Sequence, residues 1–148
     1  MQTRLFCIVQ KKICSMSPNR KNDLLYLLNI LEAIKKIEVY IGGINDAESF
    51  YIKDEQLQFN ACLSLLTHIG ESVNKICSEL KNDETSVDWK NISGFRNRIA
   101  HDYTGLDIFI VFRIIEEELP MLEEKIYLLI NKNLSTGYLI RMSFMQQK

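Results

Sequence analysis

The sequence predicts an all-α fold, an antiparallel bundle of four or five helices. Three long segments carry apolar residues at helical spacing, the pattern of helices that bury one face. The 148 residues include only two prolines and six glycines, which are few for a fold built from many short strands and turns. Hydrophobic residues make up 47% and charged residues 25% of the chain, as in a globular domain long enough to bury one core.

The first two helices are expected at residues 23–40 and 54–80, separated by a polar loop at 44–53. Asn22 or Asp23 can cap the first helix, and Gly42-Gly43 ends it. The inner face of the first helix is Leu24, Leu27, Leu28, Leu31, Ile34 and Ile41. The apolar stripe of the second is Leu57, Ala61, Leu65, Ile69, Val73, Ile76 and Leu80. Helices of this length are normal in bundles.

A short helical turn is expected around Trp89 and Ile92, with a break or bend at Ser93-Gly94. After Thr104-Gly105, Asp107 is expected to cap a last long helix. The inner face of this helix is Ile108, Val111, Ile115, Leu119, Leu122, Ile126 and Leu129. Pro120 lies inside it and should kink or divide it, because proline cannot donate the helical hydrogen bond.

One helical domain is expected at residues 16–133. Residues 1–15 are expected to be an N-terminal extension, and either Met1 or Met16 can be the native start. Residues 134–148 have weak periodicity and are expected to form a C-terminal tail. No apolar run has the length of a membrane span, and the apolar core at 5–9 is too short for a signal peptide. A cytoplasmic location and no membrane contact are therefore expected.

Charge and cysteine usage exclude two classes of function. The net charge of −1 gives no wholesale electrostatic attraction to nucleic acid, so binding would need a local patch or a groove formed by more than one chain. The chain has two histidines, His68 and His101, and no CxxC pair, so no zinc site is expected. Cys62 and Cys77 fit as small apolar fillers of one helix. These features favour a reducing compartment.

The segment SGFRNRIAHDYTGLD, residues 93–107, gathers hydrogen-bonding and titratable groups in a way that the rest of the chain does not. In a helix Asn97 and His101 are four positions apart and Arg98 and His101 three, so these side chains share a face. Arg96 and His101 are five positions apart, roughly 140° around the helix axis. Either the long arginine bends toward the histidine, or the site is completed across a dimer.

These residue types suit phosphodiester cleavage in RNA. Arg96 offers a planar fork of donors to phosphate oxygens, and His101 can transfer protons near neutral pH. Asn97 could orient the imidazole or donate to phosphate. Arg98 and Tyr103 are candidate RNA-binding residues, the tyrosine through a hydrogen bond or base stacking. The 2′-hydroxyl of RNA is an internal nucleophile, so neither a metal nor another cofactor is required.

A structural alternative remains open for the same segment. Arg96 and Arg98 could pair with the surface carboxylates at 116–118, and His101 could cap the helix end. Glu71 follows Gly70, where helices can approach closely, and either reaches the arginines or faces solvent. His68 is expected to be a surface or satisfied buried histidine, and Trp89 a core or interface anchor.

The run from Arg96 to Tyr103, RNRIAHDY, resembles the R-x4-H-x-Y motif of HepT-like toxins of the HEPN superfamily. Four further segments are similar to the rest of that family's sequence, at residues 29–43, 66–80, 87–103 and 105–126. The resemblance covers about residues 23–130. It implies a HEPN-like helical bundle that forms a homodimer, with the two motifs facing each other across a cleft.

The resemblance also implies a function. Such proteins are metal-independent endoribonucleases and the toxins of type VII-like HepT/MntA toxin–antitoxin systems. By this likeness Arg96 would hold the scissile phosphate, His101 would act as general acid and base, and Asn97 would assist. Tyr103 matches the tyrosine to which an MntA-like nucleotidyltransferase antitoxin adds AMP, which shuts the toxin off. The cleft would be locally basic, lined by Arg96 and Arg98 of both chains with Lys90.

Two other functions remain open at this point. The chain could be a non-catalytic helical binding partner of a nucleotidyltransferase, or a plain helical dimerisation domain. RNA loss caused by the protein, and AMP on Tyr103, would distinguish the ribonuclease from both.

Overall fold

The computed structural model describes residues 18–102 and 105–145, and every regular element within this part is helical. Side chains are described for residues 22–102 and 105–135. The long elements are α2 (Pro18–Ile41), α4 (Leu57–Lys75), α6 (Trp89–His101) and α8 (Leu119–Met145). The short ones are α3 (Ala47–Ile52), η1 (Lys53–Gln56), α5 (Ser78–Asp83), α7 (Ile108–Arg113) and η3 (Ile114–Glu118). The predicted all-α class is confirmed.

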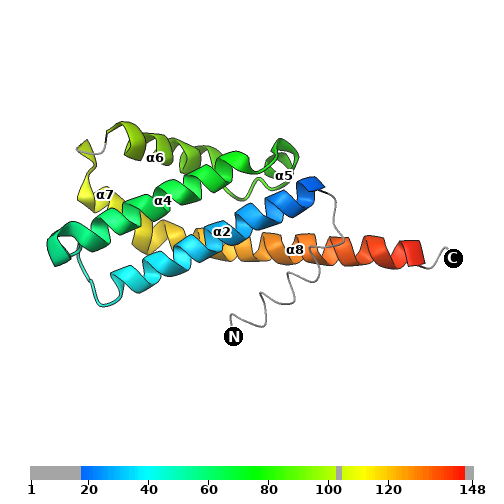
Figure 1. Ribbon diagram of the computed structural model, residues 1–148, viewed down its shortest axis with the longest axis horizontal. Helices are drawn as coiled ribbons and strands as arrows, with labels where there is room; N and C mark the ends of the chain where they lie inside the picture. The colour runs from blue at the N-terminus through cyan, green and yellow to red at the C-terminus, as the bar shows by residue number, and fades with distance from the viewer. Residues whose placement is uncertain (1–17, 103–104, 146–148) are drawn as a thin grey trace.

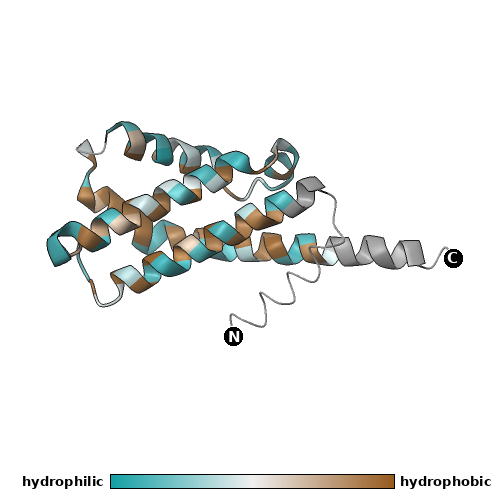
Figure 2. Ribbon diagram, in the orientation of Figure 1, coloured by the Kyte–Doolittle hydropathy of each residue, from teal (hydrophilic) through white to brown (hydrophobic). Residues whose placement is uncertain are grey.

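Helices α2, α4, α6 and α8 alternate in direction along the chain (Figure 1). α4 packs between α2 and α6, and α8 packs on α2. Apolar residues face the inside of this bundle, and polar residues cover its outer faces (Figure 2). Fully buried side chains come from several of the elements, among them Leu27, Ile34, Phe50, Ile69, Val111 and Ile126. The antiparallel bundle predicted from the sequence is therefore confirmed.

Helix α2 starts earlier than predicted and buries more residues. It begins at Pro18, so neither Asn22 nor Asp23 is its cap. Ile30 and Ile37, which the predicted stripe omits, are completely buried beside the predicted residues. Both follow the helical spacing of three to four positions, so the apolar face is wider than the single stripe suggests.

The buried carboxylate of Asp23 connects α2 to the start of α5. Its Oδ1 accepts the Cys77 backbone N–H at 2.9 Å, and its Oδ2 accepts from the Cys77 thiol at 2.9 Å. A continuous helix would direct that N–H to the Val73 carbonyl. Instead Ile76 is extended, with φ −65° and ψ 137°, and Cys77 caps the new helix. The prediction of one helix over 54–80 is therefore wrong at its C-terminal end.

The two described cysteines differ in their surroundings. Burial raises the pKa of the Cys62 thiol to about 12, and Cys62 is the small apolar filler that the sequence predicts. Burial and the Asp23 carboxylate also raise the pKa of Cys77, which works as a polar helix cap. A thiol whose pKa is raised by folding contributes to the stability of the folded state below about pH 8.5. This contribution is lost as the pH rises through the folded-state pKa.

A short helix occupies the predicted polar loop at 44–53. Asp46 begins α3, because its Oδ1 accepts the Ser49 backbone N–H at 2.8 Å. Phe50 of this helix is completely buried, with its ring centroid 5.5 Å from that of Phe59. The burial of an aromatic ring, which the loop prediction overlooked, explains why the segment is ordered as a helix.

Three residues in left-handed conformation separate α3 from α4. Asp54, Glu55 and Gln56 have φ of 46°, 54° and 69°, values that cost energy in residues with a Cβ. The second long helix therefore begins at Leu57 and not at Asp54. Leu57 is 65% exposed, so the predicted apolar stripe of this helix is wrong at its first position.

Helix α6 is continuous, although a break was predicted at Ser93-Gly94. Asp88 caps it through the Asn91 N–H, and Trp89 is buried in its first turn. Ser93 donates to Asn74 Oδ1 of α4 at 2.6 Å, and this bond holds α6 against α4 at the glycine. A glycine inside a helix costs about 1 kcal/mol, which packing against a neighbouring helix offsets.

The last helical segment begins where the sequence predicts. Asp107 Oδ1 accepts the Phe109 N–H at 2.8 Å and caps α7. The predicted effect of Pro120 takes the form of a π-helical turn, η3, immediately before α8. There the Leu119 N–H bonds to the Ile114 carbonyl, five residues earlier. The wider turn divides the segment one turn ahead of the proline.

The predicted C-terminal tail begins as a continuation of α8, which runs to Met145. Residues 1–15 and Tyr103 lie outside the described residues. None of the described helices combines the length and the apolar character that a membrane span requires.

We predict that Asp23→Ala destabilises the bundle by about 1–3 kcal/mol, because the partly buried Cys77 N–H at the start of α5 loses its acceptor. Urea unfolding followed by circular dichroism measures this change. Asp83→Ala, which removes an exposed carboxylate at the end of α5, is the control and should stay within about 0.5 kcal/mol of wild type. Equal effects of the two substitutions would contradict the role of the Asp23 link.

Candidate active site

Helix α6 carries the predicted site residues that the structure describes. Ile99 is buried against the bundle, whereas Ala100 is exposed. The Arg96 side chain is 29% exposed, and Asn97, Arg98 and His101 are exposed. One helix therefore presents all four polar side chains from a rigid and well-packed backbone.

Arg96 lies at the closest approach of α6 to α4. A Cβ added to Gly70 of α4 would overlap the Arg96 Cβ and would lie 2.8 Å from its Cγ. Any side chain at position 70 would therefore push the two helices apart. The close approach expected at Gly70 is confirmed, and it fixes the stem of Arg96 against the backbone of α4.

The guanidinium of Arg96 is held by two neighbouring side chains. Its Nη1 donates to Asn97 Oδ1 at 2.9 Å, and its Nη2 forms an ion pair with Glu71 Oε1. The Nε is buried and has no partner among the described residues. A guanidinium has five N–H donors, so besides the buried Nε one donor on each of Nη1 and Nη2 remains for a ligand or for water. The open question about Glu71 is thereby answered, because it reaches the motif arginine.

Arg96 does not pair with the surface carboxylates at 116–118, which the structural alternative named as its partners. The carboxylates at 116–118 lie on η3 and are exposed, and the ion pair of Arg96 is made with α4. No ion pair of Arg98 occurs among the described residues. The structural pairing expected with residues 116–118 is therefore wrong for Arg96, and Arg98 stays available at the surface.

His101 is the last residue of α6, and its side chain is exposed. The helix closes beyond it through the Asp102 N–H, which bonds to the Arg98 carbonyl at 2.9 Å. No hydrogen bond to the His101 side chain occurs within the described part of the chain. No hydrogen bond joins Arg96 and His101 there either, in keeping with their separation of roughly 140° around the helix. Hydrogen bonds and an ion pair thus link Arg96, Asn97 and Glu71 within one chain, and none among the described residues links Arg98 or His101 to them.

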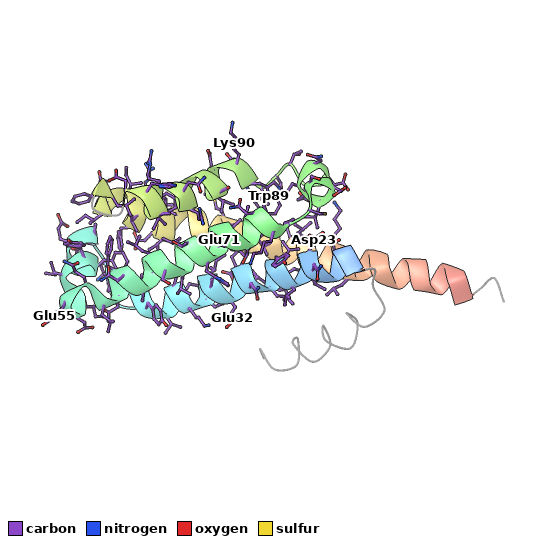
Figure 3. The ribbon with its side chains drawn as sticks, turned by 45° about the horizontal axis from the view of Figure 1, so that its top comes forward. Asp23, Glu32, Glu55, Glu71, Trp89 and Lys90 are labelled. Carbon is purple, nitrogen blue, oxygen red and sulfur yellow. The ribbon has the colours of Figure 1, made fainter. Side chains whose placement is uncertain are left out.

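The charge of α6 differs from that of the whole chain. Lys90, Arg96 and Arg98 lie within it, and no acidic residue occurs between Asp88 and Asp102, which flank it. Lys90 is exposed and points away from the bundle, as Figure 3 shows. The helix therefore carries a local excess of positive charge, part of which Glu71 neutralises, and the basic cleft between two chains stays a prediction.

The other singled-out residues are structural or exposed. His68 is exposed on α4, as expected for a surface histidine. Trp89 is buried, and its Nε1 donates to the Glu84 carbonyl at 2.9 Å, which confirms it as a core anchor. The sequence analysis missed Asn74, which ties α4 to α6 through Ser93. Its only sequence signal was its position one turn after the Gly70-Glu71 pair.

A groove of about 570 Å³ lies elsewhere on α6, between α4, η3 and α8. Ile92 and Phe95 form part of its apolar floor, and Glu117 and Lys125 lie at its polar positions. None of the candidate site residues lines it. The groove and the polar cluster around Arg96 are therefore separate features.

The chain was compared with known proteins. Residues 30–129 match the model of a family described as "Ribonuclease HepT-like". The chain is 30% identical over 107 residues to "Putative RNase TTE0752" of Caldanaerobacter subterraneus subsp. tengcongensis, which covers 72% of this chain and 93% of that protein. It is 29% identical over 100 residues to "Probable ribonuclease HepT" of Thermococcus cleftensis, which covers 68% and 88% of the two chains.

No solved structure gives a significant match. The family model covers well over half of the chain, including α4, α6 and the Arg96–His101 segment. The chain therefore belongs to the family of HepT-like ribonucleases.

Proposed function

We propose that this protein is the toxin of a type VII-like HepT/MntA system and acts as a metal-independent endoribonuclease. The observation that carries the proposal is the geometry of α6. This helix holds a fixed, partly exposed arginine and an exposed histidine on a basic surface that lacks carboxylates of its own. The names of the family and of two relatives refer to ribonucleases, which supports RNA as the substrate.

The proposed reaction uses the 2′-hydroxyl of the substrate as nucleophile. His101 takes the proton from this hydroxyl, and the 2′-oxygen bonds to the adjacent phosphorus. The bond from phosphorus to the 5′-oxygen then breaks, and the departing oxygen receives a proton from a general acid. The products are a 2′,3′-cyclic phosphate and a 5′-hydroxyl. Arg96 stabilises the extra negative charge on the phosphate oxygens in the transition state, with Asn97 fixing its Nη1.

We further propose that the active site forms between two copies of the chain. In one copy Arg96 is fixed toward α4, and no hydrogen bond joins it to His101 within the described residues. A second copy related by two-fold symmetry could supply the missing group, because a symmetric interface brings the same patch of both chains together. Two α6 helices would also double the local positive charge, including that of Arg98, in a cleft that RNA enters.

Control by a nucleotidyltransferase fits the same site. Tyr103 follows His101 by two positions, so AMP on its hydroxyl would put a bulky anion next to the catalytic groups. That anion would compete with RNA for Arg96 and would also block access sterically. The cognate MntA-like enzyme is therefore the proposed partner and antitoxin.

One observation favours the alternative of a non-catalytic binding partner. Glu71 compensates much of the charge of Arg96, which weakens a phosphate site in an isolated chain. A binding module would retain the helix and its polar face and would cause no RNA loss. The activity of histidine variants separates the two possibilities.

We predict that His101→Ala lowers the rate of RNA cleavage by about 10²–10⁴-fold, the usual contribution of general acid–base catalysis. A fluorogenic RNA oligonucleotide measures the rate. His68→Ala is the matched control, because it removes an exposed histidine from α4. The free energy of unfolding of both variants should lie within about 0.5 kcal/mol of the wild-type value, since both side chains are exposed. Unchanged cleavage by His101→Ala would remove the histidine from the mechanism.

We predict that Arg96→Ala and His101→Ala complement each other when mixed. If each site combines an arginine from one copy with a histidine from the other, a mixed dimer contains one intact site. Random pairing of equal amounts would then restore about a quarter of the wild-type rate, while each variant alone stays inactive. A mixture no more active than its separate components would place both groups of each site in one chain.

We predict that the cognate nucleotidyltransferase, with ATP, adds AMP to Tyr103 and abolishes cleavage. Intact-mass and peptide mass spectrometry should detect gains in units of AMP on that peptide. Tyr103→Phe is the control, because it lacks the acceptor hydroxyl and should stay active in the presence of the enzyme. An unmodified Tyr103 in a stable complex of the two proteins would favour the binding-partner alternative.

A further inference from the structure

Two adjacent residues of α4 fix Arg96 in different ways. Gly70 lacks the Cβ that would overlap the Arg96 Cβ, so the arginine stem lies directly against α4. Glu71, the next residue, forms the ion pair with Nη2 at the other end of the side chain. One turn of α4 thus contacts the arginine at both its base and its tip. Figure 3 labels Glu71 on α4, on the side of the bundle that α6 covers.

We propose that Glu71 is a positioning residue for RNA cleavage, which holds the Arg96 guanidinium in its reactive orientation at the expense of RNA affinity. This inference rests on the proposed function. Glu71 does not itself contact the reacting atoms. It acts through the direction in which the remaining N–H donors of Arg96 point.

The orientation of Arg96 depends on its two side-chain partners. Arginine has several rotatable bonds, and it loses much rotamer freedom when it binds a phosphate. Because Nη1 is hydrogen-bonded to Asn97 and Nη2 is paired with Glu71, Arg96 loses most of its rotamer freedom when the chain folds and not during the reaction. Asn97 is exposed and neutral, so the charge-assisted bond from Glu71 is the stronger of the two restraints.

The same carboxylate opposes RNA binding. It lies beside the guanidinium that is to hold a phosphate, and it is itself an anion of like charge to RNA. No residue of α6 between Asp88 and Asp102 carries a carboxylate that would oppose RNA binding in the same way. Removing Glu71 should therefore strengthen binding and slow cleavage. A purely structural role would weaken both, and a purely repulsive role would strengthen binding without slowing cleavage.

The experiment compares Glu71→Ala, Glu71→Gln and a control, Glu32→Ala. Glu32 is exposed on α2, on the far side of the bundle, and pairs with Lys36 at 2.7 Å. Its removal changes the net charge equally but leaves Arg96 untouched. Single-turnover cleavage of an RNA oligonucleotide gives the rate, and a 2′-O-methyl oligonucleotide of the same sequence, which has no free nucleophile, gives the Kd.

For Glu71→Ala we expect a Kd lower by about two- to five-fold, from one fewer anion near the phosphate, and cleavage slower by at least about ten-fold. Glu71→Gln keeps an oxygen that can accept from Nη2. It should therefore show the tighter binding and recover part of the lost rate. Glu32→Ala should match wild type in both measurements. Unchanged cleavage by Glu71→Ala, or equal losses of rate and affinity, would overturn the proposal.

A second measurement separates this inference from the proposed function. NMR of the arginine N–H groups reports rotation about the Nε–Cζ bond of Arg96. The Arg96 signals are identified by their absence from the spectrum of Arg96→Lys. Slow rotation in wild type and fast rotation in Glu71→Ala would support positioning by Glu71, even if wild type cleaves no RNA. Fast rotation in wild type would overturn the positioning role, whatever the activity. Absence of cleavage by wild type together with slow rotation would reject only the ribonuclease.

Discussion

The close contact between α4 and α6 at Gly70 determines how the polar motif is presented. Because position 70 has no side chain, the Arg96 stem lies against the α4 backbone, and Ser93 reaches Asn74 one turn away. These contacts hold a glycine-containing helix straight through the position where its sequence alone would break it. The rigidity of α6 therefore comes from its neighbour, and the direction of each polar side chain follows from that packing.

This packing has an electrostatic consequence for Arg96. The buried Nε has no partner among the described residues, and the tip of the side chain is tied to Glu71. A buried donor without an acceptor is unfavourable, because it has given up its bond to water. The remaining surface of α6 carries Lys90 and Arg98 without nearby acidic residues of the same helix. A chain with a net charge of −1 thus carries a local excess of positive charge on α6, the helix of the proposed phosphate site.

Sequence periodicity was sufficient for the helical class, the antiparallel order and most of the inner faces, because each depends on spacing within one helix. The predictions from the sequence were wrong where the local backbone structure depends on residues that are distant in the chain. Asp23 divides the second helix by binding Cys77, which lies 54 positions away. The left-handed turn at residues 54–56 contains no glycine that would signal it. The motif from Arg96 to His101 is local and was visible, whereas its link to Glu71 depends on the crossing of two helices.

The incompleteness of the site in one chain is itself informative. Arg96 is restrained at its base by the α4 backbone and at its tip by Glu71, so moving its guanidinium away from Glu71 would break the ion pair. A site between two chains keeps these contacts, because the histidine of a second copy approaches an arginine that is already oriented. The proposed dimer would therefore keep the orientation of Arg96 that its contacts with α4 provide.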